Sequence, residues 1–230
     1  MSLAPFLQAT AATSTVTTST EAGYAVTAPA NSVKAVRGSF HVPAVTCPSG
    51  EQVDFIIGMD NYPSWFTFAK ANEVGVDARC NGNTANYFAF YVTPGSNLNF
   101  AGNVKAGDLI KGSVAYVNGV VSLSLKDITS GLSISKTSSG VGISRSVAGW
   151  LVATGGVALP NFGTFGAGVG HTGVSKTDTA TIGTHTGSIG SFAPIAGDTV
   201  VRIQMSDPSG GAATTSSLTN GGTSFTDVWS

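Results

Sequence analysis

The chain has 230 residues, of which only 10% are Asp, Glu, Lys or Arg, and its formal net charge is -1. Because the few Lys and Arg residues are scattered along the sequence, we expect no nucleic-acid partner and no anionic membrane partner. No run of 18 apolar residues predicts a membrane span, and no amphipathic pattern predicts a long helix. The 42% hydrophobic residues and 30 glycines, with many Thr and Ser, favour a β-rich protein.

Residues 1–20 are uncharged before Glu21 and rich in Ala, Thr and Ser, which predicts a flexible N-terminal arm. A single domain is expected over 21–230, because nothing divides that stretch in two. Asn118-Gly119 is the strongest hairpin signal. At least ten short strands with turns between them predict an antiparallel β-sandwich or a closed barrel. The segments that predict strands are 35–42, 53–59, 87–92, 109–116, 120–125, 131–136, 147–153, 162–169, 199–205 and 224–229.

The two cysteines, Cys47 and Cys80, predict a disulfide that closes a loop of about 33 residues, with two unpaired buried thiols as the alternative. The three histidines lack the spacing of metal ligands, and two cysteines are too few for a zinc ribbon. The glycine-rich stretch 166–170 opens no helix and lacks a following Gly-Lys-Ser/Thr, so it predicts no nucleotide site. We therefore expect no metal and no cofactor.

The chain has three glutamates, Glu21, Glu51 and Glu73, and each is a candidate for acid–base chemistry in so charge-poor a sequence. On a strand, Glu73 and Asp77 would point to the same face. Two interpretations stay open for this pair. It is either a solvated sheet edge or part of a cleft in which crowding raises one pKa and provides a general acid.

Seven segments in order are similar to motifs of the glutamic peptidases, the eqolisin family. They cover nearly the whole chain after residue 20. The resemblance implies a concanavalin-like antiparallel β-sandwich of two curved sheets with a concave peptide-binding face. The segments are Glu21-Ala-Gly-Tyr24, Val36-Arg-Gly-Ser-Phe-His-Val-Pro43, Ile56-Ile-Gly-Met-Asp60, Ala106-Gly-Asp-Leu-Ile110, Lys126-Asp-Ile-Thr-Ser-Gly131, Ala158–Phe165 and Gly222-Thr-Ser-Phe-Thr-Asp-Val-Trp229.

The resemblance also implies where the family's catalytic residues would stand. The family's glutamate acts as general base and then as acid, and its glutamine polarises the scissile carbonyl. The glutamine motif resembles Glu73-Val-Gly-Val-Asp77, which puts Glu73 in the glutamine position. The glutamate motif resembles Ala148-Gly-Trp-Leu-Val-Ala153, which puts Gly149 in the catalytic position. The implied cleft residues are Glu21, Asp60, Asp77, Tyr87, Ala89 and Tyr91, with Ala89 in place of another family acid.

Three functional hypotheses follow, and all place the chain outside the cell as a monomer whose signal peptide is already absent. The first is a peptidase-like protein that is inactive by the family's mechanism and binds a peptide or polysaccharide in its cleft. The second is an acid endopeptidase with a rearranged carboxylate pair, Glu73 with Glu21 or with Asp77. The third is a structural or adhesive surface protein. A glycine cannot exchange a proton, so the substitution at Gly149 favours the first hypothesis.

Overall fold

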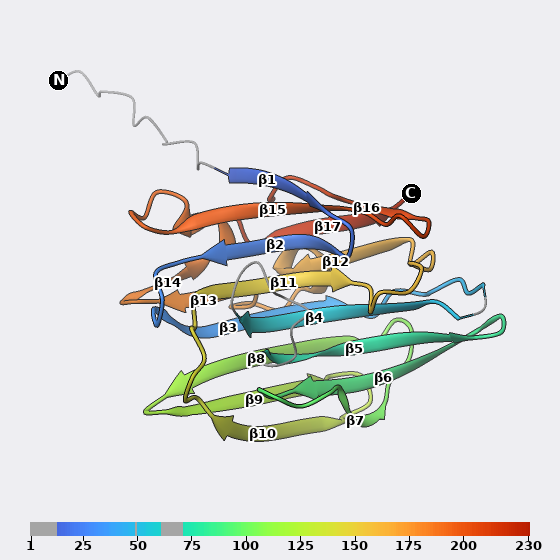
Figure 1. Cartoon of the computed structure of the whole chain (residues 1–230), viewed down its shortest axis with the longest axis horizontal. Coiled ribbons are helices and arrows are strands. Elements are labelled where there is room, and N and C mark those ends of the chain that lie inside the picture. The colour runs from blue at the N-terminus through green and yellow to red at the C-terminus, as the bar shows by residue number, and fades with distance from the viewer. Residues whose placement is uncertain (1–12, 49, 61–70) are drawn as a thin grey trace, which may run out of the picture.

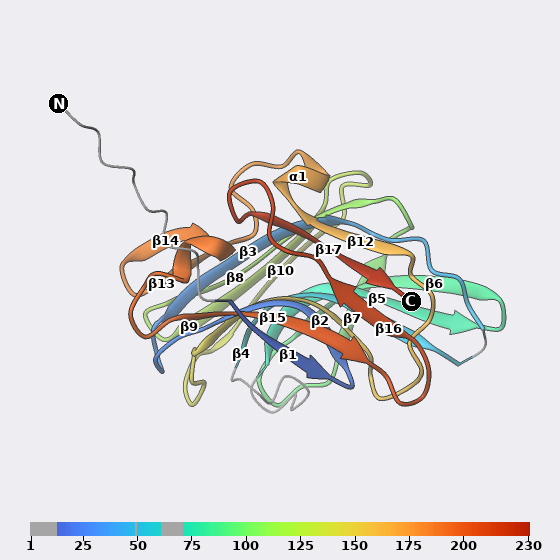
Figure 2. The same ribbon diagram turned by 90° about the horizontal axis from the view of Figure 1, so that it is seen from above.

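The computed structural model describes residues 13–48, 50–60 and 71–230, and in this part the chain is a sandwich of two β-sheets (Figures 1 and 2). The strand pairings give the order of each sheet. The first sheet runs β1 (Thr13–Thr18), β15 (Thr199–Ser206), β2 (Glu21–Thr27), β11 (Val147–Ala153), β4 (Gln52–Asp60), β5 (Asn72–Asn81), β6 (Thr84–Val92) and β7 (Asn99–Asn103).

The second sheet packs behind the first in the view of Figure 1. A hairpin of β13 (Thr179–Ile182) and β14 (His185–Ser188) adds to the free edge of β3, and β15 joins the two sheets through a short pairing with β16. Two short helices, α1 (Val169–Thr172) and η1 (Ile189–Phe192), lie in the connections. The second sheet runs β16 (Ala212–Thr215), β17 (Ser224–Trp229), β12 (Thr164–Gly168), β3 (Val33–His41), β8 (Leu109–Val117), β9 (Val120–Asp127) and β10 (Ser133–Ser139).

Alternating side chains explain why the sheets pack face to face. In β9, Val121, Leu123 and Leu125 are buried, whereas Ser122 and Ser124 are exposed. This period of two places one apolar row of each strand in the space between the sheets. The core there includes Trp150, Tyr24, Phe40, Phe55 and Phe165. The all-β sandwich predicted from the sequence is confirmed.

The strand β11 departs from simple alternation, because all seven of its residues are buried. Its even-numbered residues, such as Trp150, point into the core between the sheets. Its odd-numbered residues, such as Leu151, belong to a second apolar cluster on the opposite face of the first sheet. We call that opposite face, on β2, β11, β4, β5 and β6, the cleft face, because the family resemblance places the peptide cleft there.

The structure tests two predictions made from the sequence, the disulfide and the Asn118-Gly119 turn. Cys47 and Cys80 form a disulfide with a Cα–Cα distance of 5.3 Å, so the prediction is confirmed and the alternative of two free thiols is wrong. Asn118 and Gly119 both have positive φ, 50° and 85°, as a two-residue hairpin between β8 and β9 requires. No helix in the described part of the chain is long and apolar enough to cross a membrane.

The N-terminal arm predicted over residues 1–20 requires a correction. Thr13–Thr18 forms strand β1, which pairs in parallel with β15 along its whole length. Its Thr-rich sequence suits a strand because β-branched side chains fit a pleated surface, and composition alone did not distinguish this from a flexible segment. Residues 1–12 lie outside the described part of the chain.

Candidate functional site

The structure brings the two predicted catalytic positions into one row across three strands of the cleft face. Gly149 on β11 is the register partner of Gly58 on β4, and Gly58 is the partner of Glu73 on β5. Two strand spacings put the Cα atoms of Gly149 and Glu73 about 10 Å apart. Side chains at these two positions would therefore meet above Gly58.

Gly58 leaves the space that such a meeting needs. A Cβ atom built on Gly58 would lie 2.9 Å from Cγ of Glu73, so the Glu73 side chain lies over this glycine and reaches toward Gly149. The side chain of Glu73 is only 4% exposed. Its row continues on both sides into apolar residues, Ala25 and Val92, which are fully buried. Among the described residues from β2 to β6, this row therefore contains one carboxyl group, that of Glu73.

The next row of the cleft face is apolar and closely packed. It contains Leu151, Ile56, Gly75 and Phe90, in register from β11 to β6. A Cβ atom on Gly75 would lie 2.2 Å from the carbonyl oxygen of Phe55 and 2.9 Å from the Phe90 ring. Only glycine fits there, which explains the glycine between Glu73 and Asp77 in the motif.

The third row carries most of the acidic groups of this face. Glu21, Ala153, Asp54 and Asp77 are register partners from β2 to β5. Glu21 and Glu73 are therefore three strands and four residues apart, about 20 Å between Cα atoms, and Glu73 and Asp77 are about 13 Å apart along β5. Neither rearranged pair expected from the sequence, Glu73 with Glu21 or Glu73 with Asp77, is formed, because a strand spreads such residues along its length.

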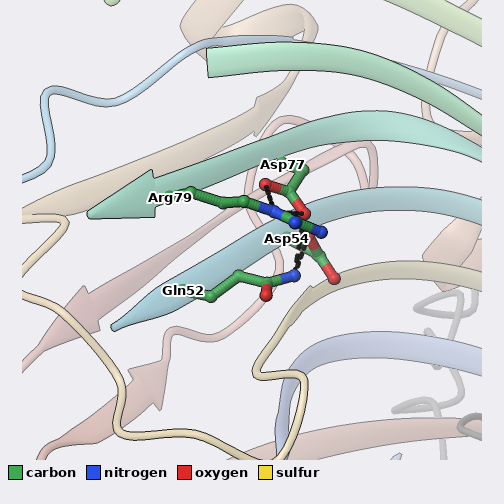
Figure 3. A network of polar contacts seen from close by, with 4 residues as sticks. All are labelled: Gln52, Asp54, Asp77 and Arg79. Carbon is green, nitrogen blue, oxygen red and sulfur yellow. Dashed lines mark hydrogen bonds and ion pairs between the residues drawn. The ribbon is translucent and has the colours of Figure 1, made fainter. Parts of the chain in front are cut away.

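Within the part of the chain that the structure describes, Asp54 and Asp77 form a carboxyl pair (Figure 3). The Asp77 side chain is fully buried, and Asp54 is 4% exposed. Nε2 of Gln52 donates to Asp77 at 2.7 Å and to Asp54 at 3.4 Å. Nε of Arg79, whose side chain is 46% exposed, lies 3.0 Å and 3.2 Å from the two oxygens of Asp77. We call these four residues the carboxyl network.

Burial raises the pKa of both acids, and the two share a hydrogen bond. For Asp54 the burial and the neighbouring Asp77 charge act together and raise the pKa well above its usual range. For Asp77 the hydrogen bond and charge of Arg79 offset part of the burial effect, so its pKa rises less. Asp54 therefore holds the proton and donates it to an ionised Asp77. Sequence reasoning missed Asp54, although a carboxylate inside the apolar run 53–59 was a usable signal.

Three predicted cleft residues lie on the other face of the sheet. Ala89 belongs to the core between the sheets, and Tyr87 and Tyr91 pack against that core. The Tyr91 ring also contacts Nζ of Lys136, which lies on β10 of the second sheet. Glu73 is the register partner of Val92, so its cleft-face neighbours on β6 are the even-numbered residues. Asp60 ends β4 opposite Val147, and its side chain lies outside the described residues.

The structure describes no group of three or more His, Cys, Asp or Glu residues that could hold a metal ion within 13–48, 50–60 and 71–230. A comparison with protein families matches the peptidase A4 family over residues 19–188. The chain belongs to the peptidase A4 family. A comparison with curated protein sequences finds no significant match.

Solved structures of glutamic peptidases share the fold of this A4-family chain. Scytalido-glutamic peptidase bound to a transition state analog inhibitor superposes with a TM-score of 0.70 at 16% identity, over 92% of this chain and 98% of that one. SCP-B, an eqolisin in complex with the tripeptide Ala-Ile-His, gives 0.68 at 14% identity over the same shares. Aspergilloglutamic peptidase from Aspergillus niger gives 0.59 at 19% identity, over 78% of this chain and 99% of that one.

Proposed function

We propose that this A4-family protein does not hydrolyse peptides by the family's glutamate–glutamine mechanism, and that it binds a peptide or glycan on its cleft face. The observation that carries the proposal is the row Gly149–Gly58–Glu73. The register supports the assignment of Gly149 to the glutamate position and Glu73 to the glutamine position. The scaffold for the catalytic pair is present, and the groups that would perform the chemistry are replaced.

The chemistry of the two replacements explains the loss. Glycine has no side chain to accept a proton from water, so no general base stands at Gly149. An ionised Glu73 accepts hydrogen bonds and donates none, so it cannot stabilise an oxyanion as an amide does. Both defects would have to be repaired together to recover hydrolysis.

Ligand binding is proposed because the rest of the cleft face keeps its architecture. SCP-B holds a tripeptide, and scytalido-glutamic peptidase holds a transition state analog, on the same fold. Here Leu151, Phe90 and Glu73 are buried, so a ligand must displace part of the chain to reach them. An apolar row beside one carboxyl suits a peptide with an apolar side chain and a cationic group.

Binding can be tested with the tripeptide Ala-Ile-His and with cellotriose by isothermal titration at pH 4 and pH 6. We expect one of the two to bind, and Glu73→Gln to weaken peptide binding about tenfold, because a charge-assisted hydrogen bond is lost. Lys105→Gln, which lies away from this face, is the matched control. Absence of binding by both probes would refute the ligand-binding part of the proposal.

The loss of hydrolysis is tested by restoration. The double variant Gly149→Glu with Glu73→Gln places a base and an amide donor on either side of Gly58. Gly149 lies in a regular strand that is paired on both sides, so the substitution needs no left-handed backbone. General acid–base catalysis is typically worth ~10²–10⁴-fold, so cleavage should rise above the wild-type baseline. Far-UV circular dichroism confirms that the variant folds before the assay is read.

The carboxyl network favours one alternative, an acid endopeptidase that uses Asp54 and Asp77. A protonated acid beside an ionised one is a chemistry that acid peptidases use. Two observations argue against this alternative. Both side chains are buried, and Asp77 already accepts hydrogen bonds from Gln52 and Arg79. If the wild type cleaves protein at acidic pH, Asp54→Asn should abolish cleavage under this alternative and leave it unchanged otherwise.

We also propose an extracellular location. The Cys47–Cys80 disulfide is typical of proteins that fold in an oxidising compartment. A low content of charged residues further suits an acidic medium, because few ion pairs are lost on acidification. Detection of the protein, with its disulfide intact, in culture medium rather than in cell lysate would test the location.

A further inference from the structure

Four of the chain's 11 Lys and Arg residues surround one surface hollow of about 380 Å³ on the second sheet. These are Arg37 on β3, Lys111 on β8, Lys126 on β9 and Lys176 in the loop after α1, and Ser113 and Ser124 lie between them. We call the four cations with their two serines the cationic face. Its members are far apart in the sequence, so the cationic face could not be predicted from the sequence.

The sheet register brings two of these charges together at a cost in stability. Lys111 and Lys126 are direct partners across β8 and β9, and like charges in that position repel. Arg37 is opposite Ser113, and Ser113 is opposite Ser124, in the neighbouring row. The outcome is a strip of cations and hydroxyl groups about 12 Å long.

The fourth cation is held in place by an anchored loop. The hydroxyl of Ser39 lies 2.8 Å from the hydroxyls of both Thr172 and Thr177, which ties the loop to β3 beside Lys111. Lys176 itself has a φ of 60°, a left-handed conformation that costs a non-glycine residue energy. A glycine would relieve this strain, yet the position carries a lysine whose charge lies over the hollow.

No carboxylate in the described part of the chain forms an ion pair with the cationic face, whereas Arg79 pairs with Asp77 on the other sheet. Asp127 is buried and bonded to Ser130 and Thr129. Asp178 is buried beneath the loop, where Oδ2 accepts the Ser39 N–H, and burial raises its pKa well above the usual range.

We propose that the cationic face is a second binding site, separate from the cleft face, and that it takes an anionic polysaccharide. Lys and Arg side chains pair with the sulfate or carboxylate groups of such a polymer, and the serine hydroxyls pair with its sugar hydroxyls. The face presents no aromatic residue to anchor a protein partner and no apolar side chain to enter a membrane. Its length matches two or three sugar units rather than a single small ion.

The test is binding of the intact protein to dextran sulfate and to polygalacturonate, measured by isothermal titration at pH 5 and two salt concentrations. Neutral dextran is the control polymer. We expect at least one of the two anionic polymers to bind, with an affinity that falls as salt rises, and no binding of neutral dextran. Which polymer binds more tightly tells whether sulfate or carboxylate is the preferred group.

Two matched double variants test whether the polymer binds at the cationic face. Lys111→Gln with Lys126→Gln should lower the affinity about tenfold, since two charge-assisted contacts are lost. Lys34→Gln with Lys105→Gln removes the same net charge elsewhere and should change the affinity less than about twofold. Lys176→Gly should weaken binding while keeping or raising the melting temperature, because it removes the charge and the strain together.

Three outcomes would overturn the proposal. One is that neither anionic polymer binds, and another is that the two double variants weaken binding equally. The third is that vesicles of anionic phospholipid or an acidic peptide bind through Lys111 and Lys126 more tightly than both polymers. Because the cleft variants leave these residues intact, failure here is distinguishable from failure of the proposed cleft function.

Discussion

The two ends of the paired strands β4 and β5 differ in their acidic groups on the cleft face. At one end, Glu73 lies over Gly58, whose register partner on the other side is Gly149. At the other end, Asp54 donates a hydrogen bond to Asp77, and Gln52 and Arg79 bind the pair. We propose that the first end is where the family's catalytic groups have been replaced.

Within one sheet, the strand register and the chemical groups that it carries can therefore change independently. A Cβ atom on Gly58 or on Gly75 would lie less than 3.0 Å from a neighbouring atom, so close packing favours glycine at both positions. The buried pair Asp54 and Asp77 is not by itself evidence for catalysis. Its effect on stability can be measured.

Asp227 is another buried acid, and its hydrogen bonding contrasts with that of Asp54, which has Asp77 and Gln52 as partners. Burial raises the pKa of Asp227 on β17 to about 7. Among the residues that the structure describes, neither of its carboxyl oxygens has a hydrogen-bond partner, because the adjacent Thr215 hydroxyl donates to the Ile203 carbonyl. A raised pKa stabilises the fold at acidic pH, and this stabilisation is lost as pH rises through 7. Asp227→Asn should therefore gain about 4 kcal/mol at pH 8 and almost nothing at pH 4, by chemical denaturation at both pH values.

Loss of the disulfide should loosen the carboxyl network more than the catalytic row. Cys80 lies at the end of β5, next to Arg79, and Cys47 precedes β4. Cys47→Ala with Cys80→Ala should lower the free energy of unfolding by ~3–4 kcal/mol. Hydrogen exchange should rise first near Asp54 and Asp77. Equal exchange at Glu73 would show that the two ends are not independent.

Gly75 lies between the two ends and tests whether close packing preserves the motif. Gly75→Ala should destabilise the protein by roughly 1–3 kcal/mol, because its Cβ would overlap the Phe55 carbonyl and the Phe90 ring. Thermal unfolding compares it with Gly155→Ala, which would add a Cβ at an ordinary 3.5 Å from Gln52 and should change stability by less than about 1 kcal/mol. Equal losses for both variants would contradict the view that only Gly75 is fixed by packing.

The carboxyl network should make its own contribution to the pH dependence of stability. Asp54 has a raised pKa, so its stabilising effect is present at acidic pH and is lost as pH rises through the folded-state pKa. Asp54→Asn keeps a donor toward Asp77 and should flatten this decline, with a change at pH 4 of less than about 1 kcal/mol.

Asp127 provides the opposite case as a control. Burial would raise its pKa, but hydrogen bonds from Ser130 and Thr129 outweigh burial and lower it. Its stabilisation is present above the unfolded pKa and is lost as pH falls. Asp127→Asn should therefore cost stability at pH 6 and little at pH 2. Parallel pH profiles for the Asp54 and Asp127 variants would refute the assigned protonation states.

Most of the fold was predictable from the sequence, because alternation in segments such as 120–125 and the Asn118-Gly119 turn are local signals. The β1 strand was missed because a Thr-rich segment has no such signal without its partner β15. Of the site, the order of the motifs predicted Gly149 and Glu73, and the register places these two residues in one row. Which carboxyls meet depends on strand neighbours, so Asp54 with Asp77, and the four cations, could not be paired from sequence alone.

The central claim is that replacement of the catalytic glutamate by Gly149 removes hydrolysis. The most direct measurement is a digest of a denatured, reduced protein substrate by the wild-type protein at pH 2–4, read by mass spectrometry. The account predicts no cleavage above the level of a blank purification, and cleavage by Gly149→Glu with Glu73→Gln. Robust cleavage by the wild type, abolished by Glu73→Ala or by Asp54→Asn, would contradict it.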